Sequence, residues 1–183
     1  MTDAATFLAL VVGALDAAAI PYMLAGSFAS SHHGAPRTTQ DIDLVIDPTW
    51  ASLDRFLASL SSDQVYVDPD VARDEFRRRG QFNVISGKTM WKVDVIFRKA
   101  RGFSHEELAR RVPAKVLGLQ VYVASAEDTV LAKLEWAKLG ESERQLRDVR
   151  GILDVQGEAL DVVYIERWLD ELGVRELWNR VRA

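Results

Sequence analysis

The 183-residue sequence contains no cysteine, no internal repeat and no low-complexity linker. The absence of cysteine excludes disulfides, thiol catalysis and zinc–thiolate sites, and it fits a cytoplasmic location. The longest apolar-rich stretch near the N-terminus, Phe7 to Ile20, is interrupted by Gly13 and Asp16. It is too short to span a bilayer and lacks the basic start of a signal peptide, so we expect a buried helix and no membrane association.

A strong overall charge is also missing, because the formal net charge is only −4. No global field would therefore draw the chain to a polyanion. The charge is uneven, however: residues 71–115 carry twelve basic side chains against five acidic ones. This region would suit a phosphate-bearing ligand, and a charged face exposed to solvent explains it equally well. Hydrophobic residues make up 48% of the chain, which is typical of a folded globular protein.

The most informative pattern is an Asp-Ile-Asp triplet that opens the apolar run 41–46. The β-branched content of this run predicts a buried strand, and side chains alternate between the two faces of a strand. Asp41 and Asp43 therefore share a face, where two adjacent carboxylates need a neutralising partner. Oxygen ligands without cysteine or clustered histidine favour Mg²⁺. A solvated edge strand or a turn also produces such a pair, and this alternative stays open.

The segment upstream of the triplet predicts an anion site. Residues 21–25 are typical of a strand that leads into Gly26 and Ser27, after which residues 28–33 predict a short helix ending at Gly34. A turn before a helix N-terminus presents backbone N–H groups to an anion, and the helix dipole favours negative charge there. Gly26 allows close approach to the backbone, and the Ser27 hydroxyl adds a donor. The segment therefore predicts a phosphate site.

A third carboxylate lies in the β-prone run Met90–Phe97, which has Asp94 near its middle. An ionisable side chain in a hydrophobic strand needs a partner. We expect Asp94 to join Asp41 and Asp43 from a neighbouring strand. The alternative is a simple ion pair with Lys92, which lies on the same face of the strand as Asp94.

The remaining segments predict an α+β (mixed α/β) protein in which strands with interspersed helices are followed by helices alone. The predicted catalytic core covers residues 1–124, and a helical segment covers residues 125–183. The predicted helices are 3–19, 49–60, 103–111, 126–139, 142–155, 161–172 and 173–182; the further strands are 65–67, 82–85 and 115–123, the last as a strand or hairpin. The first of the later helices begins with a capping-box-like pair, Ser125 and Asp128.

Together, Gly26-Ser27, the Asp41-Ile42-Asp43 triplet and Asp94 resemble the nucleotidyltransferase superfamily that includes DNA polymerase β. That superfamily has a Gly-Ser turn, a short helix, an Asp-x-Asp motif between hydrophobic residues, and a third acidic residue on a later strand. The resemblance covers about residues 17–153. It implies a mixed sheet flanked by helices, with a helical C-terminal segment.

Two further segments are similar to the small bacterial branch of minimal and AbiEii-type toxin nucleotidyltransferases. The first runs from His33 to Leu44, and the second runs from Ala126 to Leu134 and is followed by Arg147-Asp148. Membership of this branch would make the chain one half of a toxin–antitoxin pair, with a cognate partner protein.

The resemblance implies an EC 2.7.7-type reaction that moves an NMP from an NTP (ATP or another) to a hydroxyl acceptor and releases pyrophosphate. Asp41, Asp43 and Asp94 would be catalytic and would bind two Mg²⁺ ions. The acceptor would be RNA such as a tRNA end, a protein side chain, or a small molecule as in antibiotic adenylyltransferases. A non-catalytic nucleotide-binding or partner-binding module is the alternative of another class. Base preference and oligomeric state are not legible in the sequence.

Other substrate-binding residues are predicted around this framework. By resemblance, Arg37 and Lys133 bind the triphosphate; an exposed guanidinium and a lysine that extends along the surface are the alternatives. Thr39 lies on the same face as Asp41, and we expect its hydroxyl to orient the Asp41 carboxylate.

Two polar clusters receive structural interpretations. His32 and His33 are expected to end a helix, where a charged imidazole suits the dipole. A second cluster is predicted to form a salt-bridged helix face: Glu141, Glu143, Arg144, Arg147, Asp148 and Arg150.

Overall fold

The computed structural model describes residues 3–39, 41–60, 64–89, 91–140 and 142–183. Its contacts divide the chain into two compact units. The first contains the residues up to 24 together with 39–123, and the second contains residues 25–38 together with 124–183. The division into a catalytic core over 1–124 and a helical segment over 125–183 stays a prediction. In the structure, residues 25–38 belong to the same compact unit as the C-terminal helices.

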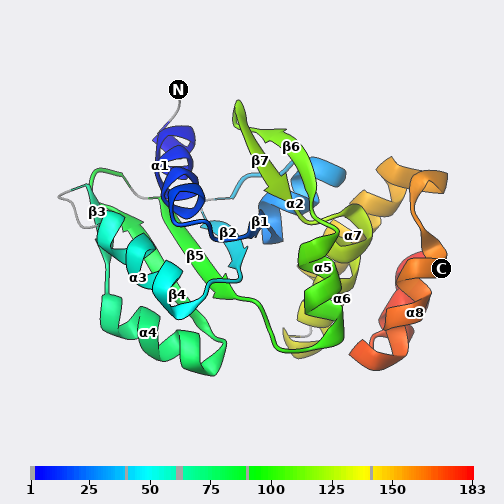
Figure 1. Cartoon of the computed structure of the whole chain (residues 1–183). Coiled ribbons are helices and arrows are strands. Elements are labelled where there is room, and N and C mark those ends of the chain that lie inside the picture. The colour runs from blue at the N-terminus through cyan, green and yellow to red at the C-terminus, as the bar shows by residue number, and fades with distance from the viewer. Residues whose placement is uncertain (1–2, 40, 61–63, 90, 141) are drawn as a thin grey trace. The chain divides into compact units, whose positions relative to one another are not determined.

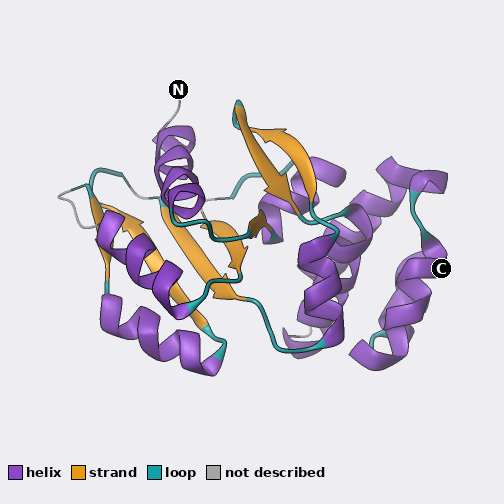
Figure 2. Ribbon diagram, viewed as in Figure 1, coloured by secondary structure: helices purple, strands orange, loops and turns teal. Residues whose placement is uncertain are grey.

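The described strands of the first unit form one seven-stranded sheet in the order β3-β4-β5-β2-β1-β7-β6 (Figure 2). The sheet is mixed, because β2 pairs in parallel with β5 and β1 in parallel with β7, while the other pairs are antiparallel. The mixed α/β fold class is therefore confirmed. The strands are β1 Tyr22–Leu24, β2 Asp41–Ile46, β3 Val65–Val67, β4 Gln81–Ser86, β5 Lys92–Phe97, β6 Val112–Val116 and β7 Leu119–Val123.

One face of the central strands is fully buried and the other is partly open. Residues of β2 and β5 alternate in burial along each strand, and Ile42, Leu44 and Val95 are completely buried. Figure 1 shows α3 and α4 side by side in front of β4 and β5. Phe76 of α4 contacts Phe97 of β5 with ring centroids 5.5 Å apart. Each such apolar side chain contributes about 1.5–3 kcal/mol when buried, so the covered face holds the unit together.

The helices of the first unit are α1 Asp3–Ala17, α3 Trp50–Ser59, α4 Pro69–Arg78 and α5 Gly102–Ala109. The start of α3 is fixed by a reciprocal cap: the Thr49 hydroxyl accepts from the backbone N–H of Ser52 at 3.2 Å, and the Ser52 hydroxyl accepts from the backbone N–H of Thr49 at 2.9 Å. Helix α4 was not predicted from the sequence. Its start is nevertheless marked by an Asp68 cap and by Pro69 in the first turn. Its few apolar positions among many charges hide the helical period.

The second unit consists of helices in the described residues. They are α2 Gly26–His33, α6 Ala126–Gly140, α7 Glu143–Gln156, α8 Val162–Leu172 and α9 Arg175–Arg182, with a short 3₁₀ turn at Gly157–Ala159. Their apolar faces meet in a core that includes Leu134, Val149, Ile165 and Trp178, all at most 1% exposed. The predicted C-terminal helices are confirmed to within a few residues at each end.

Two boundaries differ from those predicted or lie outside the described residues. Gly26 and Ser27 were predicted as a turn, but α2 already begins at Gly26. The backbone φ of Gly26 is +53°, a left-handed conformation that favours glycine. The predicted strand began at Met90, which lies outside the described residues; β5 begins at Lys92. Among the described residues, none of the helices combines the length and apolar character needed to cross a membrane.

Close packing within the second unit gives a stability prediction at Gly34. A Cβ atom at this position would lie 2.8 Å from the backbone carbon of Gly151 and from the nitrogen of Ile152. Backbone atoms cannot move aside as a side chain can, so Gly34→Ala should lower the free energy of unfolding by about 1–3 kcal/mol. Urea unfolding followed by circular dichroism measures the effect.

The matched control is Gly151→Ala on the opposite side of this contact. There the added Cβ lies 3.4 Å from the nitrogen of Ala35, and alanine favours the α7 helix. We expect this variant to be as stable as the parent or more stable. A Gly34→Ala protein with the parent's stability would contradict the close approach.

Candidate active site

The predicted carboxylates meet on the open face of the sheet. In the parallel ladder of β2 and β5, Asp43 is the register partner of Asp94, and Asp41 is the partner of Lys92. Register partners on adjacent strands are about 4.8 Å apart and point to the same face. The Asp94 side chain is 16% exposed, whereas that of Asp41 is 59% exposed. The three aspartates therefore form one cluster, graded from half-buried to exposed, opposite the apolar face.

Lys92 lies inside this cluster. Its Nζ is 3.0 Å from Oδ1 of Asp94 and 3.5 Å from Oδ1 of Asp41. The neighbouring Asp94 carboxylate, with a smaller contribution from Asp41, raises the pKa of Lys92 above its ordinary value. The sequence-based alternative of an Asp94–Lys92 ion pair is thus confirmed, and it coexists with the predicted clustering of the aspartates.

The Thr39 hydroxyl was expected to orient the Asp41 carboxylate, but its hydrogen bonds are made with the backbone of Asp41. It accepts from the backbone N–H of Asp41 at 3.3 Å and donates to the backbone carbonyl of Asp41 at 3.2 Å. Ser and Thr hydroxyls commonly make such local backbone bonds at the ends of strands. Thr39 therefore fixes the start of β2 rather than the carboxylate itself.

The donor set of the cluster suits a hard divalent cation. Among the described residues, no group of three or more His, Cys, Asp or Glu side chains is already arranged as a metal site. Oδ1 of Asp94 is nevertheless buried, and it lies 3.0 Å from Nζ of Lys92. An oxygen-only donor set that includes a buried carboxylate fits Mg²⁺.

A second cluster forms within the helical unit, around a residue that was predicted to belong to a salt-bridged helix face. Asp148 of α7 is only 8% exposed and accepts from Nζ of Lys133 at 2.7 Å. Its other oxygen lies 3.2 Å from Nε of Arg37. The interpretation of Lys133 as a surface lysine is wrong, because its side chain is only 5% exposed. Two cations share one buried anion here.

Ser27 joins this second cluster through Arg37, whose Nη2 donates to the Ser27 hydroxyl. Ser27 belongs to the first turn of α2, directly after the left-handed Gly26. The predicted Gly26, Ser27, Arg37 and Lys133 thus lie together, with Asp148 as an addition that only the structure supplies. A guanidinium and an ammonium group beside a helix N-terminus favour an anionic ligand.

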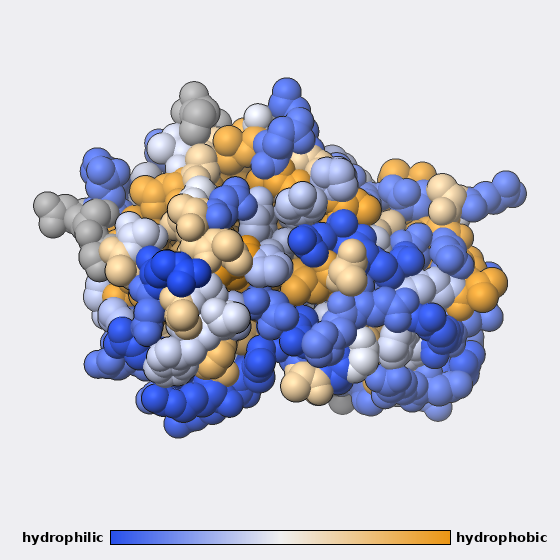
Figure 3. Space-filling model, in the orientation of Figure 1, coloured by the Kyte–Doolittle hydropathy of each residue, from blue (hydrophilic) through white to orange (hydrophobic). Residues whose placement is uncertain are grey.

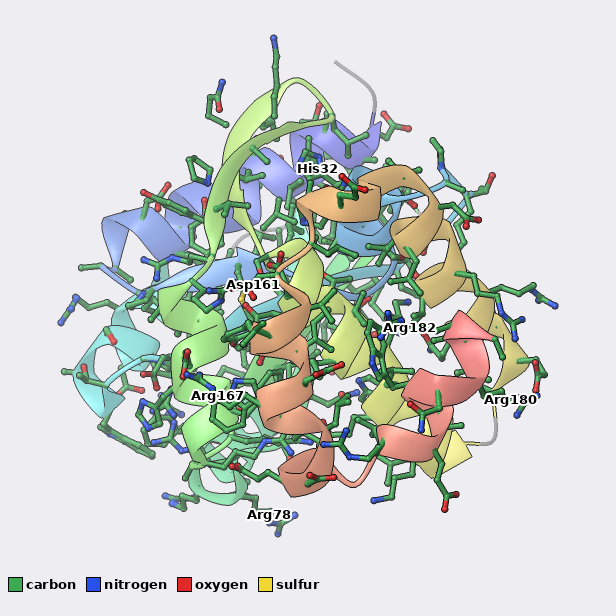
Figure 4. All side chains as sticks on the ribbon, turned by 90° about the vertical axis from the view of Figure 1, so that its right-hand side faces the viewer. His32, Arg78, Asp161, Arg167, Arg180 and Arg182 are labelled. Carbon is green, nitrogen blue, oxygen red and sulfur yellow. The ribbon has the colours of Figure 1, made fainter. Side chains whose placement is uncertain are left out.

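The predicted salt-bridged face of α7 is also wrong in its pairing. Asp148 of α7 is buried, and Glu143 of α7 pairs with Arg180 of α9. Figure 4 shows Arg180 and Arg182 on α9, the red helix. The predicted Glu141 lies outside the described residues. Sequence spacing favours pairs within a helix, whereas these acids pair with residues distant in the chain.

The basic region around α4 is largely neutralised by its own neighbours. The surface over this helix is strongly hydrophilic (Figure 3), and Arg78 projects outward at its end (Figure 4). The arginines there all lie within 4 Å of a carboxylate: Arg73 with Asp54 and Asp70, Arg77 with Asp74, Arg78 with Glu75, and Arg79 with Asp47. Little of their charge is left to attract a polyanion.

His33 differs from the expected charged helix end. It is the last residue of α2, as predicted, but its ring is buried. Nε2 lies 2.7 Å from the carbonyl oxygen of Ala124, to which it donates in the neutral tautomer. Burial lowers the pKa of His33 below its ordinary value, so a neutral imidazole is favoured.

Comparison with known proteins supports the fold of the chain. No family model matches the sequence, and no curated protein matches it. Solved structures do match, and one of them is the crystal structure of ANT(2'')-Ia in complex with adenylyl-2''-tobramycin. That structure has a TM-score of 0.61 and 14% sequence identity, and the match covers 96% of this chain and 99% of that one. An antigenic nucleotidyltransferase-like protein from Paracoccidioides brasiliensis has a TM-score of 0.54 and 16% identity, over 93% of this chain and 90% of that one. The chain therefore has a nucleotidyltransferase-like fold. Its place in the AbiEii-type branch stays a prediction.

The buried Asp148 gives a second stability prediction. Asp148→Asn removes a charge that pairs with both Lys133 and Arg37, and breaking a buried ion pair costs about 3–5 kcal/mol. We expect a clear fall in the urea unfolding midpoint. As a control, Asp170→Asn breaks an exposed pair with Arg175 and should leave the midpoint nearly unchanged. Equal midpoints for the two variants would contradict the buried network.

The neutral His33 predicts a pH dependence of stability. Because its pKa is lowered in the folded state, the unfolded chain takes up the proton more readily. The contribution of His33 is therefore present above about pH 6.5 and is lost as the pH falls below it. His33→Gln, which keeps a neutral donor, should reduce the fall in unfolding temperature between about pH 7.5 and about pH 5.5. His105→Gln, at an exposed position of α5, should leave that fall unchanged.

Proposed function

We propose that the chain is a nucleotidyltransferase that moves an NMP from an NTP to a hydroxyl acceptor and releases pyrophosphate. The observation that carries this proposal is the pairing of Asp43 with Asp94 in the parallel ladder, with Asp41 on the same face. This arrangement occurs within a nucleotidyltransferase-like fold. A cluster of carboxylates on an otherwise hydrophobic strand pair is costly for stability, and a functional role explains why it is present.

Asp41, Asp43 and Asp94 would hold two Mg²⁺ ions, as the oxygen-only donor set favours. When bound, the ions would neutralise phosphate charge and make the acceptor hydroxyl more acidic. In this scheme Asp94, whose side chain is only 16% exposed, takes the acceptor proton. The acceptor oxygen then forms a bond to the α-phosphorus. The bond from that phosphorus to the bridging oxygen breaks, and pyrophosphate leaves with the electron pair.

The cluster of Ser27, Arg37 and Lys133 would bind phosphate groups of the nucleotide. Its cations are held by the buried Asp148 and therefore lose little side-chain freedom when an anion binds. The backbone at Gly26 and the Ser27 hydroxyl add donors at the start of α2. Since catalysis of this kind depends on positioning and electrostatics, fixed cations are an advantage.

Two observations favour a small hydroxylated acceptor over RNA. The α4 arginines are paired with acids, so they offer little attraction to a nucleic-acid backbone. The similar ANT(2'')-Ia is described in complex with adenylyl-2''-tobramycin, a nucleotidylated small molecule. A tRNA or protein acceptor, a cognate partner and a toxin role rest on the sequence resemblance alone.

The test is incubation of the full chain with each α-labelled NTP, Mg²⁺ and either a panel of hydroxylated small molecules or bulk RNA. We expect label on a small molecule. Asp43→Asn should lower this transfer at least about a hundredfold, because a metal-binding carboxylate is lost. The circular dichroism spectrum should be unchanged. The matched control, Asp70→Asn at a 94% exposed side chain, should transfer label normally.

Other results would change the proposal in different ways. Label on RNA, with a steep dependence on salt, would move the acceptor to nucleic acid. Stabilisation by Mg-NTP without transfer to any acceptor would favour the non-catalytic binding module. Full transfer by Asp43→Asn would overturn the role of the carboxylates.

A further inference from the structure

The carboxylate cluster already contains a cation supplied by the chain. Lys92 Nζ lies within 3.5 Å of oxygens from both Asp41 and Asp94. The contact follows from the β2–β5 ladder: Lys92 is the register partner of Asp41 and precedes Asp94 by two residues on the same strand. All of these side chains therefore share the open face, and Lys92 bridges the more exposed and the more buried carboxylate.

The bridge is important because the aspartates repel one another. Asp43 and Asp94 are direct cross-strand neighbours, and like charges opposite each other destabilise a sheet. Without a cation, the open face would carry three adjacent carboxylates. The ammonium group of Lys92 compensates part of this repulsion in the absence of metal.

The same oxygens are the ones that a divalent cation would use. A carboxylate oxygen that binds Mg²⁺ at about 2.1 Å cannot keep an ammonium group at 3.0 Å without strong repulsion between the two cations. The Lys92 side chain is 35% exposed and ends in a flexible four-carbon chain, so it can move aside without disturbing the core.

We propose that Lys92 is a displaceable counter-cation, which occupies the carboxylate cluster until a divalent metal replaces it and thereby sets the metal affinity of the site. The inference rests on the metal-binding part of the proposed function. Lys92 is a positioning residue in this scheme: it holds Asp41 and Asp94 together on the open face of the metal-free protein. It weakens metal binding because it must first be displaced.

The experiment measures Mn²⁺ binding to the full chain without nucleotide, from the electron paramagnetic resonance signal of the free aqua ion. Lys92→Met removes the charge and keeps the length of the side chain. We expect it to bind Mn²⁺ about three- to tenfold more tightly than the parent, the scale of a partly exposed ion pair. In EDTA its unfolding temperature should be lower, because the carboxylates then lack a cation.

Two further variants separate this role from general charge effects. Lys92→Arg keeps the cation and should resemble the parent in Mn²⁺ affinity and in unfolding temperature. Lys115→Met removes an exposed lysine from β6 of the same unit and should leave the Mn²⁺ affinity unchanged. An equal gain in Lys115→Met would overturn the inference, since it would show only a loss of overall positive charge.

Other outcomes distinguish a failure of the Lys92 inference from a failure of the proposed metal site. Equal or weaker Mn²⁺ binding by Lys92→Met than by the parent overturns the inference and leaves the metal site standing. If neither protein binds Mn²⁺, the inference fails together with the metal-binding part of the proposed function.

Discussion

The parallel register between β2 and β5 is the constraint on which the site depends. It makes Asp43 the neighbour of Asp94 and Asp41 the neighbour of Lys92, and it directs all four side chains to the open face. The register is fixed from the other face, where Ile42, Leu44 and Val95 are fully buried. A slip of one residue would exchange the faces of a strand and bury carboxylates in the core. Apolar packing on one side therefore maintains a costly charge cluster on the other.

The helical unit also contains buried charges, and there an ion pair compensates them. Lys133 and Asp148 are both almost fully buried, and their pairing avoids the cost of an isolated buried charge. Arg37 and Ser27 attach to the same network from the segment around α2. Both charge clusters of this protein thus combine acids and bases, and in neither are the described carboxylates left to repel without a cation.

Local sequence signals predicted most of the elements because each had a clear physical cause. The β-branched runs gave the central strands, and Thr49 with Ser52 gave a true helix cap. The alternation of Asp41, Ile42 and Asp43 was sufficient to place both carboxylates on one face. Helix α4 was missed because its many charges hide its apolar face, although Asp68 and Pro69 mark its start. The predicted salt-bridged α7 face and the charged His33 were wrong for a related reason, since burial by segments distant in the chain leaves no local signal.

By itself, the sequence determined which residues carry charge, which faces of the strands they occupy, and where most helices begin and end. These properties follow from backbone periodicity and from side chains near one another in the chain. Only the tertiary structure decided that Asp94 pairs with Asp43, that Lys92 bridges two carboxylates, and that Asp148 joins Lys133 to Arg37. Strand order, register and burial depend on contacts between segments far apart in the chain, and local periodicity does not encode those contacts.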